Sequence, residues 1–217
     1  MDFQSNRFYH IISYGCQANM SDSEHYAGQL EELGYHNTED LDTADVILIN
    51  TCCVRETAED KTLGKIGELK HLKKQNPDLI IAVTGCMAQE WQDKLFKRAP
   101  HIDLVIGTHN IHKLIELIRE RRSKADHYMA ADMTLPAFHD MPVKRFQKFF
   151  AWIPIMNGCN KFCTYCIVPY VRGREVSRPI DAIVEEIKKV AAEGYKEITL
   201  LGQNVNSYGL DLKDGTD

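Results

Sequence analysis

The chain has 217 residues, of which 44% are hydrophobic and 26% charged, and its formal net charge is -5. This is the composition of an ordinary globular protein with one large or two modest domains, and its charge gives no support to nucleic-acid binding by the chain as a whole. The first six residues lack a signal-peptide pattern, and the longest apolar runs, such as residues 79–83, are far too short to span a bilayer. We therefore expect a cytoplasmic protein without membrane association.

Strand-like and helix-like segments alternate over residues 1–121. Apolar runs predict strands at residues 8–14, 46–49, 79–83 and 104–106, and apolar periodicity predicts helices at 21–33, 54–74, 86–98 and 110–121. Repeated strand–helix units are typical of a parallel sheet with helices packed on its faces. The expected fold class is therefore α/β, with residues 1–121 forming a doubly wound, flavodoxin-like domain.

Residues 122–148 are polar and show little periodicity, which indicates a linker between domains. A strand at 149–156, a helix at 179–192 and a second strand at 198–201 are predicted after it. Two strand–helix units cannot close a barrel, and a parallel sheet normally has both faces covered. We therefore expect residues 149–217 to be the beginning of an incomplete α/β barrel.

The chain has seven cysteines. Structural disulfides are rare in a reducing compartment, so metal binding or catalysis is the favoured explanation, with scattered core cysteines as the alternative. Cys159, Cys163 and Cys166 lie within eight residues, in the loop after a predicted strand. Such a loop can direct three thiolates at three irons of a cubane cluster and leave the fourth iron open for a ligand. A zinc site and a redox pair formed by Cys163 and Cys166 are the alternatives.

The other cysteines are far apart in the sequence but similarly placed. Cys16, Cys52 and Cys86 each follow a predicted parallel strand, and the carboxyl ends of such strands meet at the edge where ligands bind. Small or polar residues precede them and leave room for a bulky ligand. We expect a second metal site with three thiolates. Cys53 is either a fourth ligand or, as we expect, a buried cysteine that points away.

The spacing Cys-x-x-x-Cys-x-aromatic-Cys resembles the signature of the radical S-adenosylmethionine (SAM) superfamily. The chain as a whole resembles the methylthiotransferase family within it. The matching segments are SYGCQAN at 13–19 with DS at 22–23, NTCCVRE at 50–56, TGC at 84–86, and FCTYCIVPYVRGRE at 162–175. Residues 149–217 would then be the start of a truncated radical SAM (β/α) barrel.

The resemblance implies a transferase with two 4Fe-4S clusters. The SAM-binding cluster would be held by Cys159, Cys163 and Cys166, and the auxiliary cluster by the other trio. In this family a deoxyadenosyl radical takes hydrogen from C2 of a tRNA adenine, the auxiliary cluster supplies sulfur, and a second SAM supplies the methyl group. A reducing donor such as flavodoxin or ferredoxin is the implied protein partner.

Segments NTCCVRE at 50–56 and LGQNVNSY at 201–208 look like the branch that modifies isopentenylated adenosine next to the tRNA anticodon. The other branches act on threonylcarbamoyl-adenosine of tRNA or on an aspartate of a ribosomal protein, and these remain alternatives. An inactive, truncated iron–sulfur module is an alternative of another class.

Five further residues are candidates for cofactor binding. By the resemblance, Tyr165 would lie against the adenine of SAM. Arg172 or Arg174 could face the SAM carboxylate or, with other basic residues, tRNA phosphates. Gln203 and Asn204 follow the second strand of the barrel and are candidates for SAM or adenosine contacts. Two basic groups could contact tRNA phosphates, with ordinary solvated charge as the alternative for each residue: Lys144, Arg145 and Lys148, and Arg172, Arg174 and Arg178.

Overall fold

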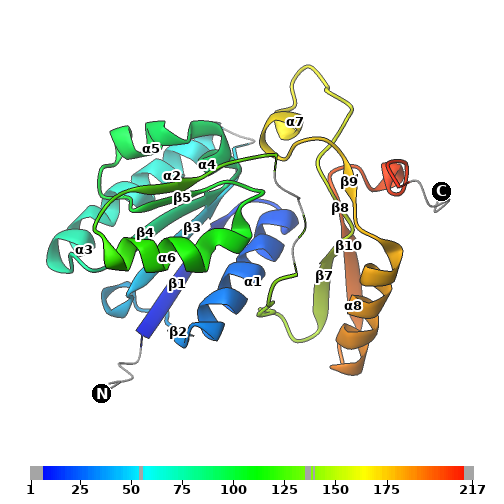
Figure 1. The fold of residues 1–217 in the computed structure, drawn as a ribbon, viewed down its shortest axis with the longest axis horizontal. Helices are drawn as coiled ribbons and strands as arrows, with labels where there is room; N and C mark the ends of the chain where they lie inside the picture. The colour runs from blue at the N-terminus through cyan, green and yellow to red at the C-terminus, as the bar shows by residue number, and fades with distance from the viewer. Residues whose placement is uncertain (1–6, 54–55, 135–137, 139, 213–217) are drawn as a thin grey trace.

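The computed structural model describes residues 7–53, 56–134, 138 and 140–212. Its N-terminal half is a parallel six-stranded sheet with the order β2-β1-β3-β4-β5-β6 (Figure 1). The strands are β1 (Arg7–Tyr14), β2 (Tyr35–Asn37), β3 (Val46–Thr51), β4 (Ile80–Gly85), β5 (Leu104–Ile106) and β6 (Tyr128–Ala130). This order is that of a flavodoxin-like sheet with one added strand, so the predicted fold class is confirmed.

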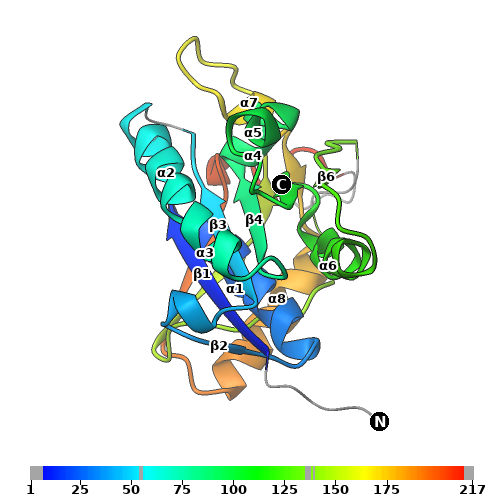
Figure 2. The same ribbon diagram turned by 90° about the vertical axis from the view of Figure 1, so that its left-hand side faces the viewer.

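Helices cover both faces of this sheet (Figure 2). One face packs against α1 (Gln17–Glu32) and α6 (Leu114–Ser123). The other packs against α2 (Glu56–Glu68), α3 (Lys70–Gln75), α4 (Cys86–Trp91) and α5 (Asp93–Arg98). Central strands β3 and β4 are buried along their whole length, which explains why they are continuous apolar runs rather than alternating ones.

Several predicted boundaries differ from the observed ones. Helix α1 begins four residues before the predicted start at Ser21, because the Asn19 side chain accepts a hydrogen bond from the Cys16 amide (3.4 Å) and caps the first turn. The predicted helix to residue 98 is two helices, since Gln92 has a φ of 47° that no α-helix allows. The single helix predicted over 54–74 is likewise two, and its predicted first residues, Val54 and Arg55, lie outside the described part of the chain.

The second half of the chain starts a new sheet. Strands β7 (Phe150–Pro154) and β10 (Glu197–Leu201) pair in parallel, and α8 (Ile180–Ala192) connects them and packs on β7. The predicted strand over 149–156 ends at Pro154, after which β8 (Met156–Asn157) pairs antiparallel with β9 (Val176–Ser177). A short helix, α7 (Val168–Val171), lies between β8 and β9. This is the expected start of an α/β barrel.

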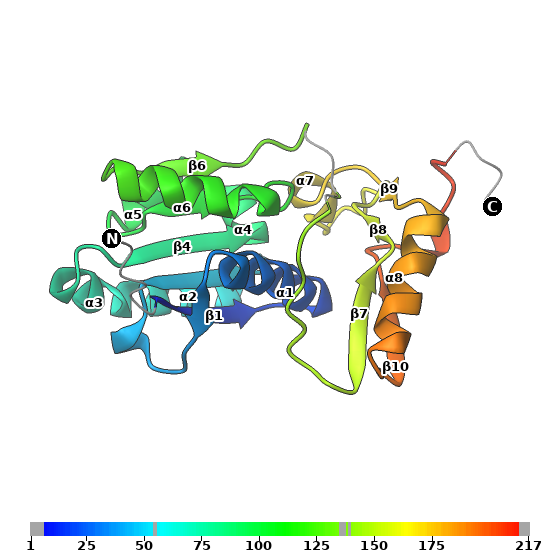
Figure 3. The ribbon, with the colours of Figure 1, turned by 60° about the horizontal axis from the view of Figure 1, so that its bottom comes forward.

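The segment between the two halves is not a loose connection. Strand β6 lies inside the predicted linker of residues 122–148 and completes the first sheet. Residues 140–148, here called the strap, then cross α1 on their way to β7 (Figure 3). The backbone amides of Lys144 and Phe146 donate to the carbonyl and the carboxylate of Glu24, both at 2.9 Å. The strap therefore fixes β7 beside α1.

None of the helices in the described ranges combines the length and apolarity that crossing a bilayer requires.

Candidate metal centres

The strand register brings Cys16, Cys52 and Cys86 to one edge of the first sheet. Strands β1, β3 and β4 are neighbours, with Tyr14 beside Thr51 and Thr51 beside Gly85. Each cysteine follows one of these paired residues within two positions. The three thiols therefore leave the sheet at the same level, as the sequence predicts.

Two of these thiols touch. The Cys86 side chain is within hydrogen-bond distance of both Cys52 and Cys53, and these contacts, together with Arg172, hold the pKa of Cys86 well below its usual range. The pKa of Cys53 is raised by its hydrogen bond to Cys86 and by burial. Cys53 is buried, as expected, but the expectation that it points away is wrong because its side chain meets Cys86.

A buried polar network supports the strand ends beneath the thiols. Asn19 donates to the side chain of Asn50 (3.2 Å) and to the Thr51 carbonyl (3.3 Å), and Asn50 returns a bond to the Asn19 carbonyl (2.7 Å). The Oδ1 of Asn19 also lies 3.5 Å from the Sγ of Cys16. One amide therefore ties the first cysteine to the strand that carries the second.

Gly85 allows the third strand end to approach equally closely. Its φ is +87°, and a Cβ there would lie 2.5 Å from the carbonyl oxygen of Thr51 and still closer to the Asn50 side chain. Only glycine combines this backbone conformation with this contact.

The thiols of the second candidate site lie in the loop between β8 and α7. At its base, the Cys159 amide donates to the Gly173 carbonyl (3.1 Å), and the Cys166 amide donates to the Cys163 carbonyl (2.9 Å) within a turn. Gly158 has a φ of +81°, and a Cβ there would lie 2.5 Å from the carbonyl carbon of Arg174 and still closer to its carbonyl oxygen. The base of the loop is thus fixed while Cys163 is exposed.

Each trio offers three free thiols, which is the donor set of an iron–sulfur cluster with one open iron. All seven cysteines are free, and within the described residues no three Cys, His, Asp or Glu side chains converge tightly enough to ligate a single metal ion. Ligands of a cubane bind different irons and are therefore spaced more widely than the ligands of one tetrahedral ion.

The structure places four of the five predicted cofactor-binding residues around the second cysteine loop. Tyr165 is 91% exposed at the tip of the loop, and the Arg174 guanidinium lies 4.3 Å from the ring centre of Phe162. Gln203 accepts a hydrogen bond from the Gly158 amide (2.6 Å). Asn204 donates to Glu175 (3.1 Å) after the end of β10.

Arg172 lies elsewhere. Its side chain is buried, its Nη2 donates to Asp22 of α1 at 2.7 Å, and its Nη1 lies 3.4 Å from the Asn157 side-chain oxygen. Its carbonyl oxygen is 3.0 Å from Nε2 of His109, in the loop after β5. Asp22 stood out in the sequence only as part of the first motif, and nothing there indicated that Arg172 contacts Asp22, Asn157 or His109.

The two cysteine groups are joined through the segment that contains Arg172. Helix α7 packs against α4, which begins at Cys86, and Val171 lies in the core of the first sheet. The Thr108 hydroxyl donates to the Val171 carbonyl. The loop that carries the second trio is therefore anchored on the domain that carries the first.

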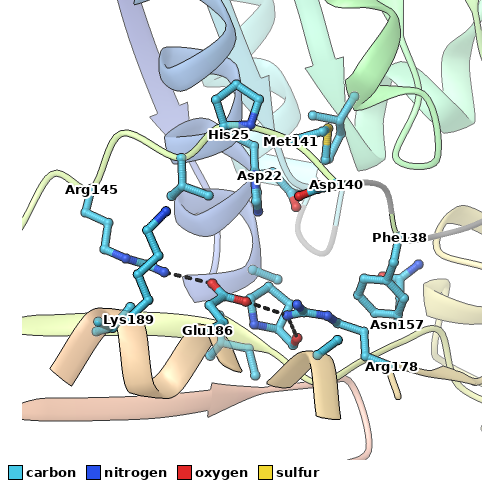
Figure 4. A pocket seen from close by; sticks show the side chains of 18 of the residues that line it. Asp22, His25, Phe138, Asp140, Met141, Arg145, Asn157, Arg178, Glu186 and Lys189 are labelled. Carbon is cyan, nitrogen blue, oxygen red and sulfur yellow. Dashed lines mark hydrogen bonds and ion pairs between the residues drawn. The ribbon is translucent and has the colours of Figure 1, made fainter. Parts of the chain in front are cut away.

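A cavity of about 1060 Å³ lies between α1, the strap and α8 (Figure 4). Arg145 and Arg178 both reach into it and share Glu186, each at 2.8 Å. Arg145 also pairs with Glu24 (3.5 Å) and donates to the Trp152 carbonyl (2.9 Å). A contact of these two arginines with tRNA phosphates does not fit this placement, because Arg145 pairs with Glu24 and Glu186 across the two halves and Arg178 pairs with Glu186 within the second half.

Two family models match the chain. Residues 8–107 match the uncharacterized protein family UPF0004, and residues 153–214 match the radical SAM superfamily. By fold, the chain is similar to a radical S-adenosylmethionine methyltransferase, TsrM, from Kitasatospora setae, with a TM-score of 0.57 and 15% identity over 93% of this chain and 49% of that one. At this identity the similarity concerns the fold alone.

Curated relatives are much more similar in sequence. The chain is 51% identical to a protein of Thermoanaerobacter sp. (strain X514) named tRNA-2-methylthio-N(6)-dimethylallyladenosine synthase, over 96% of this chain and 45% of that protein. Proteins of the same name are 52% identical to it in Dictyoglomus thermophilum, over 94% of this chain and 47% of that protein. The protein of Staphylococcus aureus (strain JH9) is also 52% identical, over 97% of this chain and 41% of that protein. The chain thus spans less than half the length of the curated relatives it matches.

The fold and the two matches define a UPF0004 domain followed by part of a radical SAM domain. More particularly, nearly the whole chain is similar to proteins named tRNA-2-methylthio-N(6)-dimethylallyladenosine synthase, in line with the resemblance that the sequence motifs indicate.

Proposed function

We propose that this chain is the cluster-binding part of a tRNA methylthiotransferase that adds a methylthio group to C2 of isopentenylated adenosine next to the anticodon. The observation that carries the proposal is the pair of thiol trios on adjoining elements. One follows three neighbouring strands in register, and the other lies in a loop whose exit helix packs on α4. The substrate is proposed from the names of relatives that are 51–52% identical.

We assign a 4Fe-4S cluster to each trio. Cys159, Cys163 and Cys166 would hold the cluster that binds SAM, and Cys16, Cys52 and Cys86 the auxiliary one. When bound, the first cluster and SAM supply the radical that activates the adenine carbon, and the auxiliary cluster supplies the sulfur.

The chain's own residues position these groups. Gln203 restrains the Gly158 amide at the start of the loop (2.6 Å), so β10 sets the position of the first cysteine of the trio. Exposed Tyr165 and Arg174 remain free to cover the adenine and the carboxylate of SAM. The contact between α7 and α4 keeps both trios in one assembly, as a reaction that needs both centres requires.

The proposed nucleic-acid contact is the outer face of the same loop. Phe162 and Tyr170 are exposed, their rings meet edge to face at 5.9 Å, and Arg174 lies over Phe162. Exposed aromatic rings can stack on a splayed-out base of an RNA loop. We propose a flavodoxin or ferredoxin as the electron donor and the cytoplasm as the place of action.

Reconstituting the full-length protein anaerobically and incubating it with SAM, a reductant and tRNA bearing isopentenyl-adenosine tests this function. Mass analysis of the digested nucleosides should find the 2-methylthio product, and the triple variant Cys159→Ala, Cys163→Ala, Cys166→Ala should form none. A product only on threonylcarbamoyl-adenosine or on a ribosomal-protein aspartate would move the chain to another branch. Absence of SAM cleavage would favour an inactive iron–sulfur module.

A further inference from the structure

Arg172 belongs to the segment that follows the second trio, yet its guanidinium lies at the first. The sequence separation between Arg172 and its ion-pair partner Asp22 is 150 residues, and their atoms are 2.7 Å apart. The arginine is 6% exposed. A charge buried this deeply requires compensation from its surroundings.

The compensation comes from the auxiliary site as well as from Asp22. Arg172 directly follows Val171, which packs in the same core cluster as Cys86, and α7, which ends at Val171, packs against α4, which begins at Cys86. The guanidinium lies close enough to the Cys86 and Cys16 side chains to interact with them electrostatically. The main electrostatic partners of Arg172 thus include two of the three auxiliary thiols.

We propose that Arg172 is a positioning residue of the auxiliary cluster: it holds a buried positive charge against the thiolates of Cys16 and Cys86 and docks the radical SAM half onto the sheet edge that carries them. The inference rests on the proposed auxiliary cluster and adds the residue that sets its electrostatic environment. It also gives Arg172 a place different from the SAM-carboxylate contact expected from sequence.

The shape of the arginine suits this role. One terminal nitrogen meets Asp22 of α1 and the other approaches Asn157, which directly precedes Gly158 and Cys159. A lysine would supply a point charge but could not span both partners in a fixed fork. Arg172 therefore connects the backbone that begins the second cysteine loop to the thiols of the first trio.

The redox potential of the auxiliary cluster distinguishes two roles of Arg172: a purely structural ion pair would leave the potential unchanged, whereas a charge that acts on the cluster would set it. A positive charge beside an iron–sulfur cluster stabilises its reduced form, since cluster potentials depend on net charge and on hydrogen bonds to sulfur. Arg172→Gln should therefore shift the midpoint potential of the auxiliary cluster to more negative values. Asp22→Asn should shift it to less negative values, because the arginine then lacks its carboxylate counter-charge.

The test uses the full-length protein with Cys159, Cys163 and Cys166 replaced by Ala, so that only the auxiliary cluster gives a paramagnetic signal. Iron is counted first, and potentials are then measured by redox titration with electron paramagnetic resonance. Arg98→Gln removes the same charge from an exposed position on α5 and serves as the control. Arg172→Lys keeps the charge without the fork and should shift the potential less than Arg172→Gln.

Opposite shifts in Arg172→Gln and Asp22→Asn, with Arg98→Gln unchanged, support the proposal. Equal potentials in all variants, or shifts of the same sign in both, overturn it even if both variants lose stability. If Arg172→Gln does not fold, Asp22→Asn decides alone, since its isosteric amide can still accept a hydrogen bond. If the parent binds no iron, the proposed auxiliary cluster fails before the arginine is tested.

Discussion

Gly28 is the point where the strap crosses α1, and replacing it with Ala should destabilise the protein. A Cβ at this position would lie 2.5 Å from the carbonyl oxygen of Pro142, 2.6 Å from its carbon and 2.8 Å from the amide nitrogen of Val143. All three are backbone atoms, so no side chain can rotate away. The strap itself would have to move off the helix.

The steric cost of the added methyl group should exceed the stability that alanine gains from its higher helix propensity. Gly→Ala in a helix interior stabilises by about 1 kcal/mol where space is free. Overpacking typically costs about 1–3 kcal/mol, and a displaced strap also loses the two hydrogen bonds to Glu24, each contributing about 1 kcal/mol. We expect Gly28→Ala to lower the free energy of unfolding by about 2–4 kcal/mol in total, after the gain in helix propensity is subtracted.

Gly64 provides the matched control because it is an exposed glycine inside α2, and a methyl group added there would have nothing within 4 Å. Gly64→Ala should raise the free energy of unfolding by about 0.5–1 kcal/mol. Urea unfolding followed by circular dichroism compares the two variants. Tryptic cleavage after Lys144 or Arg145, measured under native conditions, should accelerate in Gly28→Ala only. A Gly28→Ala protein as stable as Gly64→Ala, with an uncut strap, would refute this account of the crossing.

Three further predictions concern buried groups. Gly85→Ala should separate the ends of β3 and β4, because its Cβ would meet the Thr51 carbonyl at 2.5 Å, and iron analysis after reconstitution should show loss of about half the metal. Asp103→Asn removes the counter-charge of Lys73 (2.8 Å) and should cost about 3 kcal/mol in urea unfolding; an unchanged midpoint would contradict this. Burial raises the pKa of Glu24 above its ordinary value of 4.5, so the folded chain holds that proton more tightly. The stability advantage of the parent over Glu24→Gln, measured as the difference in their free energies of unfolding, should therefore decrease as pH rises from 4 to 7. An increase over this range would contradict a raised pKa of Glu24.

The first sheet was predictable because its central strands are continuous apolar runs between turn residues. The edge strands β2 and β6 have three residues each and offer too short a pattern to recognise. The break at Gln92 depends on a left-handed backbone conformation that residue type does not indicate. The strap looked like a linker because its hydrogen bonds go to α1, which is far away in the sequence.

The candidate site was predictable to the extent that topology decides it. Parallel strands end at the same edge, so cysteines after β1, β3 and β4 had to meet there. Side-chain direction was not predictable: Cys53 meets Cys86, and Arg172 turns toward Asp22 instead of toward the loop that it follows. Both outcomes depend on packing between segments far apart in the chain.

The central claim is that each thiol trio holds its own four-iron cluster. Iron and sulfide are counted after anaerobic reconstitution of the protein, of the triple variant Cys16→Ala, Cys52→Ala, Cys86→Ala, and of the corresponding variant at Cys159, Cys163 and Cys166. The account predicts about eight irons in the parent and about four in each triple variant. Unchanged iron in either triple variant, or bound zinc with almost no iron in the parent, would contradict it.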